Sequence, residues 1–249
     1  MSKLKNKVAI ITGASKGIGA GIAKAYGIEG ASVVVNYSSD KEGAERVVNE
    51  INTNGGKAIA VQGNVSLAAD VKKLFSETSN AFGQVDILVN NAGVFKFEPL
   101  EAITEEEFHR QFNINVLGTI LTTQQAVHDF GDNGGSIINI SSVVSNNPPA
   151  YSLVYSATKG AVDTFAIALS KELAGKKIRI NTIAPGGVET EGTHTAGIIG
   201  GDFEKQIIAD TPLGRIGQPS DIAKVAVFLA SDEAAWVNGE KITVSGGLR

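Results

Sequence analysis

The sequence predicts an α/β protein built on a doubly wound parallel sheet, and three observations support this. Short runs of β-branched residues alternate with segments whose apolar residues recur at helical spacing. These runs seldom alternate with polar residues, which is typical of strands covered by helices on both faces. Strand and helix follow each other about six times, which favours right-handed crossovers between parallel strands.

Each expected strand is a short run rich in valine and isoleucine, residues that pack well on a pleated surface. The first run is followed by Thr12 and Gly13. The expected strands are 8–11, 33–35, 58–61, 85–89, 137–140, 178–183 and 242–244.

Between these runs, apolar residues recur three and four positions apart, as on one face of a helix. Thr104 and Glu107 form a capping box at the start of one long segment. No linker, repeat or block of charge divides the chain, so we expect a single domain over residues 1–249. The clearest helical segments are 70–82, 104–130 and 156–173.

Composition excludes several functions. The chain has no cysteine, which excludes disulfides, thiolate nucleophiles and thiolate metal ligands. Its formal net charge is −4, so we expect neither nucleic acid nor a membrane as a partner. The three histidines are far apart in sequence, so we expect no metal site. The apolar run at 8–11 is too short for a secretion signal or a membrane span, which favours a cytoplasmic protein.

Glycine is unusually frequent, with 29 among 249 residues. Gly13, Gly17 and Gly19 follow the first strand and open the first helix, where backbone N–H groups bind the diphosphate of a dinucleotide. We expect Gly13 to permit the turn, Gly17 to let the backbone approach phosphate, and Gly19 to let the helix pack closely. An ordinary βα turn is the alternative interpretation.

Tyr155 and Lys159 are four residues apart in a helical segment, so both side chains project from one face. A nearby ammonium group stabilises a phenolate and lowers the pKa of the phenol. Ser142 follows the strand at 137–140 and brings a hydroxyl to the carboxyl edge, where open α/β sheets bind ligands. Alone, Tyr155 and Lys159 would indicate a surface pair; with Ser142 they favour acid–base chemistry.

Together these motifs resemble the classical short-chain dehydrogenase/reductase (SDR) family over essentially the whole chain. The glycine spacing is similar to that family's Thr-Gly-x-x-x-Gly-x-Gly. Further matches are Asn90-Asn91-Ala92-Gly93, Asn115, Ser142, Tyr155-x-x-x-Lys159 and Pro185-Gly186. The resemblance implies a Rossmann-type fold with about seven parallel strands in the order 3-2-1-4-5-6-7.

The resemblance also implies catalytic roles. Tyr155 would protonate a substrate carbonyl oxygen or deprotonate the alcohol, and Ser142 would hydrogen-bond that oxygen. Lys159 would lower the pKa of Tyr155 and hold the nicotinamide ribose. Asn115 would anchor a water in the proton relay, while hydride passes to or from the nicotinamide.

Two neighbouring residues compete for these roles. Ser141 is the alternative to Ser142, and Asn113 is the alternative to Asn115. We prefer Ser142 and Asn115 because their spacing matches the family, and we give Ser141 a supporting role.

We expect the cofactor to be NADP(H) in preference to NAD(H). NAD-dependent enzymes usually carry an acid at the end of the second strand, and here the run is Asn36-Tyr37-Ser38-Ser39, with Asp40 later as an alternative. Lys16 stands where NADP-preferring SDR members often carry a base for the 2′-phosphate; a solvated loop lysine is the alternative. The expected cofactor-binding residues are Gly13, Ser15, Lys16, Gly17, Ile18, Gly19, Asn36, Tyr37, Ser38, Ser39, Asn64, Val65, Asn91, Ala92, Gly93, Tyr155, Lys159, Pro185, Gly186, Val188 and Thr190.

The chain departs from the family pattern at two positions. Asn64 stands where the family commonly has aspartate, and we expect its amide oxygen to bond the adenine amine. Ser245 replaces a frequent aspartate in Val244-Ser245-Gly246-Gly247, and we have no functional account of that change.

The expected substrate site is apolar. The segment at about 186–210 follows the sixth strand without clear periodicity and, by resemblance, covers the substrate; His194 lies in it. This composition favours a moderately apolar ketone over a phosphorylated sugar. The expected wall residues are Phe95, Phe97, Pro148, Pro149, Tyr151, Ile198 and Ile199.

We therefore expect an NADPH-dependent carbonyl reductase that reduces a ketone to a secondary alcohol and, by resemblance, forms a homotetramer. Similar chains include 3-oxoacyl-acyl-carrier-protein reductases and glucose or polyol dehydrogenases, which remain alternatives. Lys96 and Arg110 are basic residues near the expected entrance, so an acyl-carrier protein remains an alternative partner. A nucleotide-sensing binding protein is the alternative outside enzymes, although it would have no need of a proton donor.

Overall fold

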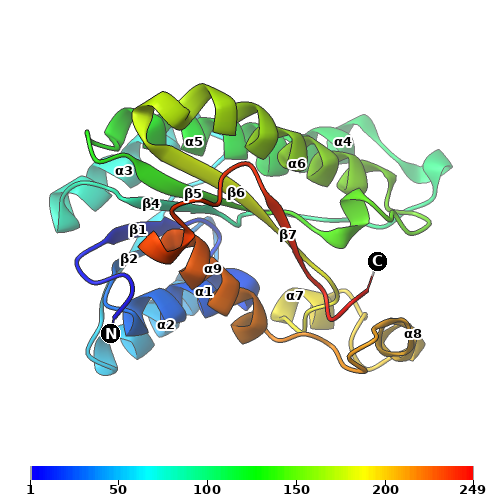
Figure 1. Cartoon of the computed structure of the whole chain (residues 1–249). Helices are drawn as coiled ribbons and strands as arrows, with labels where there is room; N and C mark the ends of the chain where they lie inside the picture. The colour runs from blue at the N-terminus through cyan, green and yellow to red at the C-terminus, as the bar shows by residue number, and fades with distance from the viewer. Residues whose placement is uncertain (1, 249) are drawn as a thin grey trace.

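The computed structural model describes residues 2–248, which build a seven-stranded sheet between two layers of helices (Figure 1). Neighbouring strands are parallel, and their order is β3-β2-β1-β4-β5-β6-β7, which confirms the expected fold class and strand order. The strands are β1 Val8–Ile11, β2 Ser32–Tyr37, β3 Lys57–Gln62, β4 Ile87–Asn90, β5 Gly135–Ile140, β6 Ile178–Pro185 and β7 Lys241–Val244.

Helices α1, α2 and α9 cover one face of the sheet, and α3, α5 and α6 cover the other (Figure 1). Two short helices, α7 and α8, lie beyond the carboxyl end of β7, near the C-terminus of the chain. The helices are α1 Gly17–Ile28, α2 Lys41–Thr53, α3 Ala68–Phe82, α4 Glu105–Phe112, α5 Gly118–Asp129, α6 Leu153–Leu173, α7 Glu191–Thr195, α8 Asp202–Asp210 and α9 Pro219–Ala230, with 3₁₀ turns at Leu100–Ala102, Val143–Ser145, Ala174–Lys176 and Asp232–Ala234.

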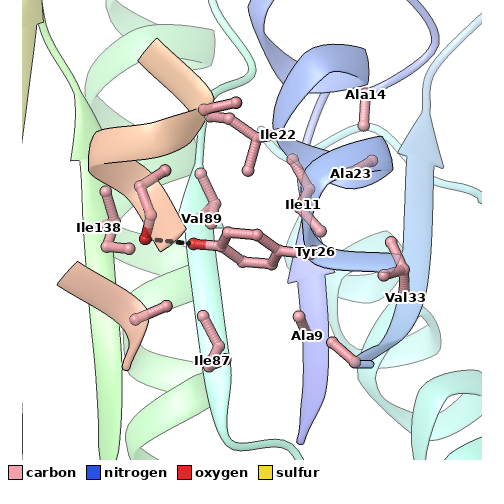
Figure 2. Packing of buried hydrophobic residues seen from close by; sticks show 14 of the residues in the cluster. Ala9, Ile11, Ala14, Ile22, Ala23, Tyr26, Val33, Ile87, Val89 and Ile138 are labelled. Carbon is pink, nitrogen blue, oxygen red and sulfur yellow. Dashed lines mark hydrogen bonds between the residues drawn. The ribbon is translucent and has the colours of Figure 1, made fainter. Parts of the chain in front are cut away.

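Both faces of the sheet are buried, which explains the unbroken apolar runs of the strands. On one face Tyr26 of α1 is fully buried against strand residues such as Ile87 and Val89 (Figure 2). Its hydroxyl donates a hydrogen bond of 3.0 Å to the Ala226 carbonyl oxygen of α9, so the buried phenol is satisfied. On the other face, Phe75 of α3 is fully buried in a second cluster with residues of α5 and α6.

The helical segment expected at 104–130 is interrupted. Thr104 caps α4, and its hydroxyl accepts a hydrogen bond from the Glu107 N–H. Residues Asn113–Leu117 then form a turn of π-helix before α5 begins at Gly118. Such turns are frequent at functional sites. Periodicity did not predict this one because the apolar spacing continues across it.

The strand order determines which edge of the sheet can bind a ligand. β1 pairs with β2 on one side and with β4 on the other, so the winding reverses between β1 and β4. The loops after these two strands therefore diverge, and such a crevice is the usual ligand site of open α/β sheets. Within residues 2–248, none of the helices has the length and apolar character needed to cross a membrane.

Candidate active site

A cavity of about 730 Å³ runs along this carboxyl edge. Its walls come from the glycine loop between β1 and α1, the loop after β4, and the segment after β6. Of the catalytic candidates, Ser142, Tyr155 and Lys159 line the cavity, whereas Asn115 lies outside its lining. The expected cofactor-binding residues all line it, with the exception of Gly19.

The backbone of the glycine loop adopts conformations that are strained for residues other than glycine. Gly13 and Gly17 have φ values of +61° and +59°, a region that side chains rarely adopt. A Cβ at Gly13 would lie 2.8 Å from the Ala92 Cα, and one at Gly19 would lie 2.4 Å from the Asn91 amide nitrogen. Gly13 therefore permits the turn, and Gly19 permits close packing against Asn91 beneath the cavity.

Two asparagines hold this loop from either side. The Asn36 amide oxygen accepts a hydrogen bond of 3.2 Å from the Gly13 N–H, and its amide nitrogen donates at 3.0 Å to the Gly63 carbonyl oxygen. The Asn91 amide nitrogen donates to the Thr12 and Gly13 carbonyl oxygens, both at 2.9 Å. We expected both residues among the cofactor contacts; in the structure their side chains bind backbone and shape the loop.

At the end of β2, Asp40 accepts a hydrogen bond of 3.0 Å from the Gly43 N–H and caps α2. Ser38 and Ser39 are exposed and line the cavity. Lys16 is also exposed and lines the cavity, and it takes part in none of the ion pairs found among residues 2–248. The cationic and hydroxyl groups at this end are therefore available to a ligand.

The two departures from the family pattern have local roles. The Asn64 amide oxygen, which we expected to face adenine, accepts hydrogen bonds from the Ser66 N–H at 3.0 Å and the Ser66 hydroxyl at 2.8 Å. The Ser245 hydroxyl donates at 2.8 Å to the Leu248 carbonyl oxygen. Both side chains thus stabilise loops next to the cavity.

Helix α6 and strand β5 bring Tyr155, Lys159 and Ser142 together. Lys159 Nζ lies 5.7 Å from the centroid of the Tyr155 ring. Ser142 follows β5, and its hydroxyl accepts a hydrogen bond of 3.4 Å from the Val144 N–H and lowers the pKa of the neighbouring Tyr155 phenol. The buried Lys159 ammonium donates at 2.8 Å to the Ile140 carbonyl oxygen at the end of β5. One lysine therefore connects the helix to the strand that carries the serine.

The pKa values of this group are set mainly by burial. Desolvation raises the pKa of Tyr155 to about 12, and the neighbouring Ser142 hydroxyl opposes that rise. Burial lowers the pKa of Lys159 to about 8, and the Asp163 carboxylate opposes that fall. We expected Lys159 to lower the pKa of Tyr155. The pKa of Tyr155 is raised overall because desolvation of the phenol dominates. The Lys159 ammonium lies 5.7 Å from the ring centroid and donates to the Ile140 carbonyl oxygen.

Lys159 is expected to make stability depend on pH. Its pKa is 10.5 when unperturbed and about 8 in the fold, so between these values the unfolded chain binds one more proton. The free energy of unfolding should therefore rise with pH from about pH 8 to pH 10, by up to about 1.4 kcal/mol per pH unit. Below about pH 8 the burial penalty on the charged amine applies in full. Above about pH 10 the raised pKa of Tyr155 acts in the opposite direction.

Urea denaturation of the wild type and Lys159→Met across this pH range measures the effect. The rise should disappear in the variant because methionine does not titrate. The same slope in both proteins would show that Lys159 keeps an ordinary pKa.

The structure separates the alternatives for the serine and the asparagine. Ser141 is buried, and its hydroxyl donates at 3.3 Å to the Lys159 carbonyl oxygen, whereas Ser142 lines the cavity. Asn113 is exposed, whereas Asn115 is buried within the π-turn.

Asn115 joins the loop after β4 to helix α6. Its amide oxygen accepts from the Val94 N–H and its amide nitrogen donates to the Val94 carbonyl oxygen, both at 2.8 Å. The amide nitrogen also donates at 3.0 Å to the buried Thr158 hydroxyl. We expected Asn115 to anchor a water; in this structure its side chain holds the backbone that passes beside Tyr155.

Aromatic side chains form the wall at the substrate end. The rings of Phe95 and Phe97 have centroids 5.7 and 6.2 Å from that of Tyr155, and 5.7 Å from each other. Ile198, Ile199 and Phe203 line the cavity from the segment that contains α7 and α8, and Pro149 lines it from the loop after β5. Pro148 and Tyr151, which we expected in this wall, are outside the lining.

Three basic side chains near this end are paired with carboxylates. Lys96 lies 2.6 Å from Glu98, and Arg110 contacts both carboxylate oxygens of Glu107, at 2.7 and 2.8 Å. His194 pairs with Glu189 at 3.1 Å. In the part of the chain that the structure describes, no group of three acidic or histidine side chains could hold a metal ion.

Two acidic residues near the site were missed by the sequence analysis. Asp163 binds Lys241 of β7, with Nζ and Oδ2 2.5 Å apart. Its spacing of four from Lys159 was a signal that could have identified it. Glu191 accepts a hydrogen bond of 2.9 Å from the Gly17 N–H, a contact between residues 174 positions apart. No local spacing predicts such a contact.

Known proteins are similar to this chain over nearly its whole length. Residues 13–249 match a family model described as enoyl-(acyl carrier protein) reductase. An uncharacterized oxidoreductase of Methylorubrum extorquens is 56% identical over 100% of both chains. The crystal structure of angucycline C-6 ketoreductase LanV with bound NADP has a TM-score of 0.93 and 33% identity, over 99% of this chain and 96% of its own. A short-chain dehydrogenase/reductase from Serratia marcescens has a TM-score of 0.93 and 32% identity, over 99% of both chains.

Proposed function

Because the chain belongs to the short-chain dehydrogenase/reductase family, we propose that it is an NADP(H)-dependent carbonyl reductase that reversibly converts an apolar ketone into a secondary alcohol. One observation carries the proposal: Tyr155, Ser142 and Lys159 line the same cavity as the glycine loop. A proton donor and an anion-binding loop in one cavity suit a reaction between a dinucleotide and a carbonyl compound.

The glycine loop suits the diphosphate of a nicotinamide cofactor. The Gly17 N–H already donates to a carboxylate oxygen, so the loop accepts an anion. At the other end, a Cβ on Gly93 would lie 3.6 Å from Lys159 Nζ, so the loop after β4 passes within contact distance of the ammonium. The bound cofactor supplies or accepts the hydride.

The chain's own residues handle the proton. The raised pKa keeps the Tyr155 hydroxyl protonated at neutral pH, so it can donate a proton to the carbonyl oxygen of a bound ketone. Ser142 lies beside that hydroxyl and can hydrogen-bond the same substrate oxygen. The Lys159 ammonium, when charged, stabilises the phenolate that remains. In the oxidation direction, the same phenolate accepts the proton of the alcohol.

Lys16→Ala is expected to lower kcat/KM for NADPH by roughly five- to tenfold, because one charge-assisted contact to the 2′-phosphate is lost. The value for NADH should stay nearly unchanged, since NADH lacks that phosphate. Steady-state kinetics with both cofactors measures this, with exposed Lys171 on α6 changed to alanine as the control. A wild type that prefers NADH would contradict the assignment of NADP(H).

Three observations support an apolar ketone as the substrate. Phe95 and Phe97 lie beside the ring of Tyr155, and LanV is described as a ketoreductase. From α8, Phe203 and Ile207 line the same cavity, together with Gln206 and Asp210, whose side chains bind each other. The 3-oxoacyl-acyl-carrier-protein reductase alternative needs a basic entrance for the carrier protein. Its two candidate cations, Lys96 and Arg110, are each paired with a glutamate.

A panel of ketones, polyols and 3-oxoacyl thioesters, followed by NADPH absorbance, tests the proposed function. The rate of reduction of apolar and aromatic ketones should exceed the rate of oxidation of polyols. Turnover of polyols or carrier-bound thioesters alone would favour those alternatives. NADPH binding without turnover of any compound would favour a nucleotide-sensing protein.

We also propose that the protein is a cytoplasmic homotetramer. Helices α5 and α6 expose large apolar side chains, among them Ile120, Leu153 and Ile167, and Trp236 before β7 is fully exposed. Association of these helices and of β7 would cover them. Light scattering should give about four times the 25.8 kDa chain mass, and a monomer would contradict the proposal.

A further inference from the structure

Glu191 places a negative charge at the centre of the glycine loop. It is the first residue of α7, and its Oε2 accepts a hydrogen bond of 2.9 Å from the N–H of Gly17, the first residue of α1. The two segments are in close contact here, since a Cβ on Gly17 would lie 3.3 Å from the Thr190 side chain. Among residues 2–248, the ion pairs do not include Glu191, so no cation neutralises its charge.

The Gly17 N–H can serve only one anion at a time. The start of α1 carries partial positive charge and unpaired N–H groups, which favour a carboxylate or a phosphate. In a dinucleotide fold this is where the diphosphate binds. A bound diphosphate would need the same N–H and would also be repelled by the Glu191 carboxylate.

We propose that Glu191 acts as an internal anion that competes with the cofactor diphosphate for the glycine loop and must leave Gly17 when the cofactor binds. The inference rests on the proposed function, because it assumes a dinucleotide in the cavity. It assigns Glu191 a regulatory role: the residue weakens cofactor binding and keeps α7 against the loop in the free protein.

Release of Glu191 would also move the substrate wall. Thr190 and Thr193 cap α7 reciprocally, with hydrogen bonds of 2.9 and 3.1 Å, so α7 behaves as one short unit. The Ile198 N–H donates at 3.0 Å to the Thr193 carbonyl oxygen. Ile198 lines the cavity, and so cofactor binding is coupled to the shape of the substrate end.

Calorimetric titration of the full-length protein with NADPH, ADP and adenosine tests the competition. Glu191→Gln keeps the size of the side chain and removes its charge. It should tighten binding of NADPH and ADP by about three- to tenfold and leave adenosine, which has no phosphate, unchanged. Glu204→Gln is the matched control, because Glu204 also accepts a backbone N–H in this segment, from Gly200 at 2.7 Å, but lies outside the cavity lining.

Amide hydrogen exchange provides a second measurement. It uses the wild type, so its result does not depend on whether a variant folds. Adding ADP should speed exchange in residues 191–195, because α7 loses its contact with Gly17. Unchanged or weaker ADP binding in Glu191→Gln, or exchange in 191–195 that ADP does not speed, would overturn the inference while leaving the proposed function intact. If neither protein binds NADPH or ADP, both the proposed function and this inference fail.

Discussion

Replacing Tyr155 with phenylalanine is expected to lower kcat for ketone reduction by about 10³-fold, within the range that general acids contribute. Phenylalanine keeps the ring that packs against Phe95 and Phe97, with centroids 5.7 and 6.2 Å away, and removes only the hydroxyl. The proton for the carbonyl oxygen must then come from water. NADPH binding should change little, because the glycine loop is untouched.

Absorbance assays for turnover and fluorescence titration for NADPH binding separate these two effects. Tyr151→Phe is the matched control: this tyrosine is exposed, lies four residues earlier and is outside the cavity lining. Full activity in the Tyr155 variant would remove Tyr155 as the proton donor.

Replacing Asn115 with alanine is expected to lower the free energy of unfolding by about 2–4 kcal/mol, since each unpaired buried polar group costs about 1–3 kcal/mol. The change leaves the Val94 N–H, the Val94 carbonyl oxygen and the Thr158 hydroxyl without their amide partner. Catalysis should fall as well, because the loop that carries Phe95 loses its attachment to α6.

Thermal and urea denaturation measure this loss. Asn113→Ala is the control, because Asn113 is exposed at the start of the same π-turn, and an exposed substitution changes stability by less than about 0.5 kcal/mol. Equal effects of the two substitutions would show that the π-turn, and not the Asn115 amide group, determines stability.

The fold was predictable because strands and helices have local signals. The seven β-branched runs all became strands, and the glycine loop was located from the strand that precedes it. The prediction of one continuous helix over 104–130 was wrong in the middle of that range. Asn115 forms its hydrogen bonds with Val94 and Thr158, which come from other parts of the chain. Its own neighbours in sequence therefore carry no sign of the π-turn.

The residues that line the candidate site were largely predictable, whereas the hydrogen bonds that some of them make were not. Tyr155 and Lys159 share a face of α6 because of their spacing, and Ser142 reaches them because β5 ends at the same sheet edge. Two expected cofactor contacts, Asn36 and Asn91, bind the loop backbone. An asparagine side chain can bind backbone as well as a ligand, so these backbone contacts could not be predicted without the position of the loop.

The sequence by itself determined the strands, the position of the glycine loop and the grouping of Ser142, Tyr155 and Lys159 at one edge of the sheet, because periodicity and short spacings are local properties. Its resemblance to the SDR family supplied the strand order. The tertiary structure decided the pKa values of the buried groups and the position of the Glu191 carboxylate. Burial raises the pKa of Tyr155 and lowers that of Lys159, and the fold brings Glu191 onto Gly17 from 174 residues away. Desolvation and electrostatic contact depend on which segments pack together, and no local pattern of residues contains that information.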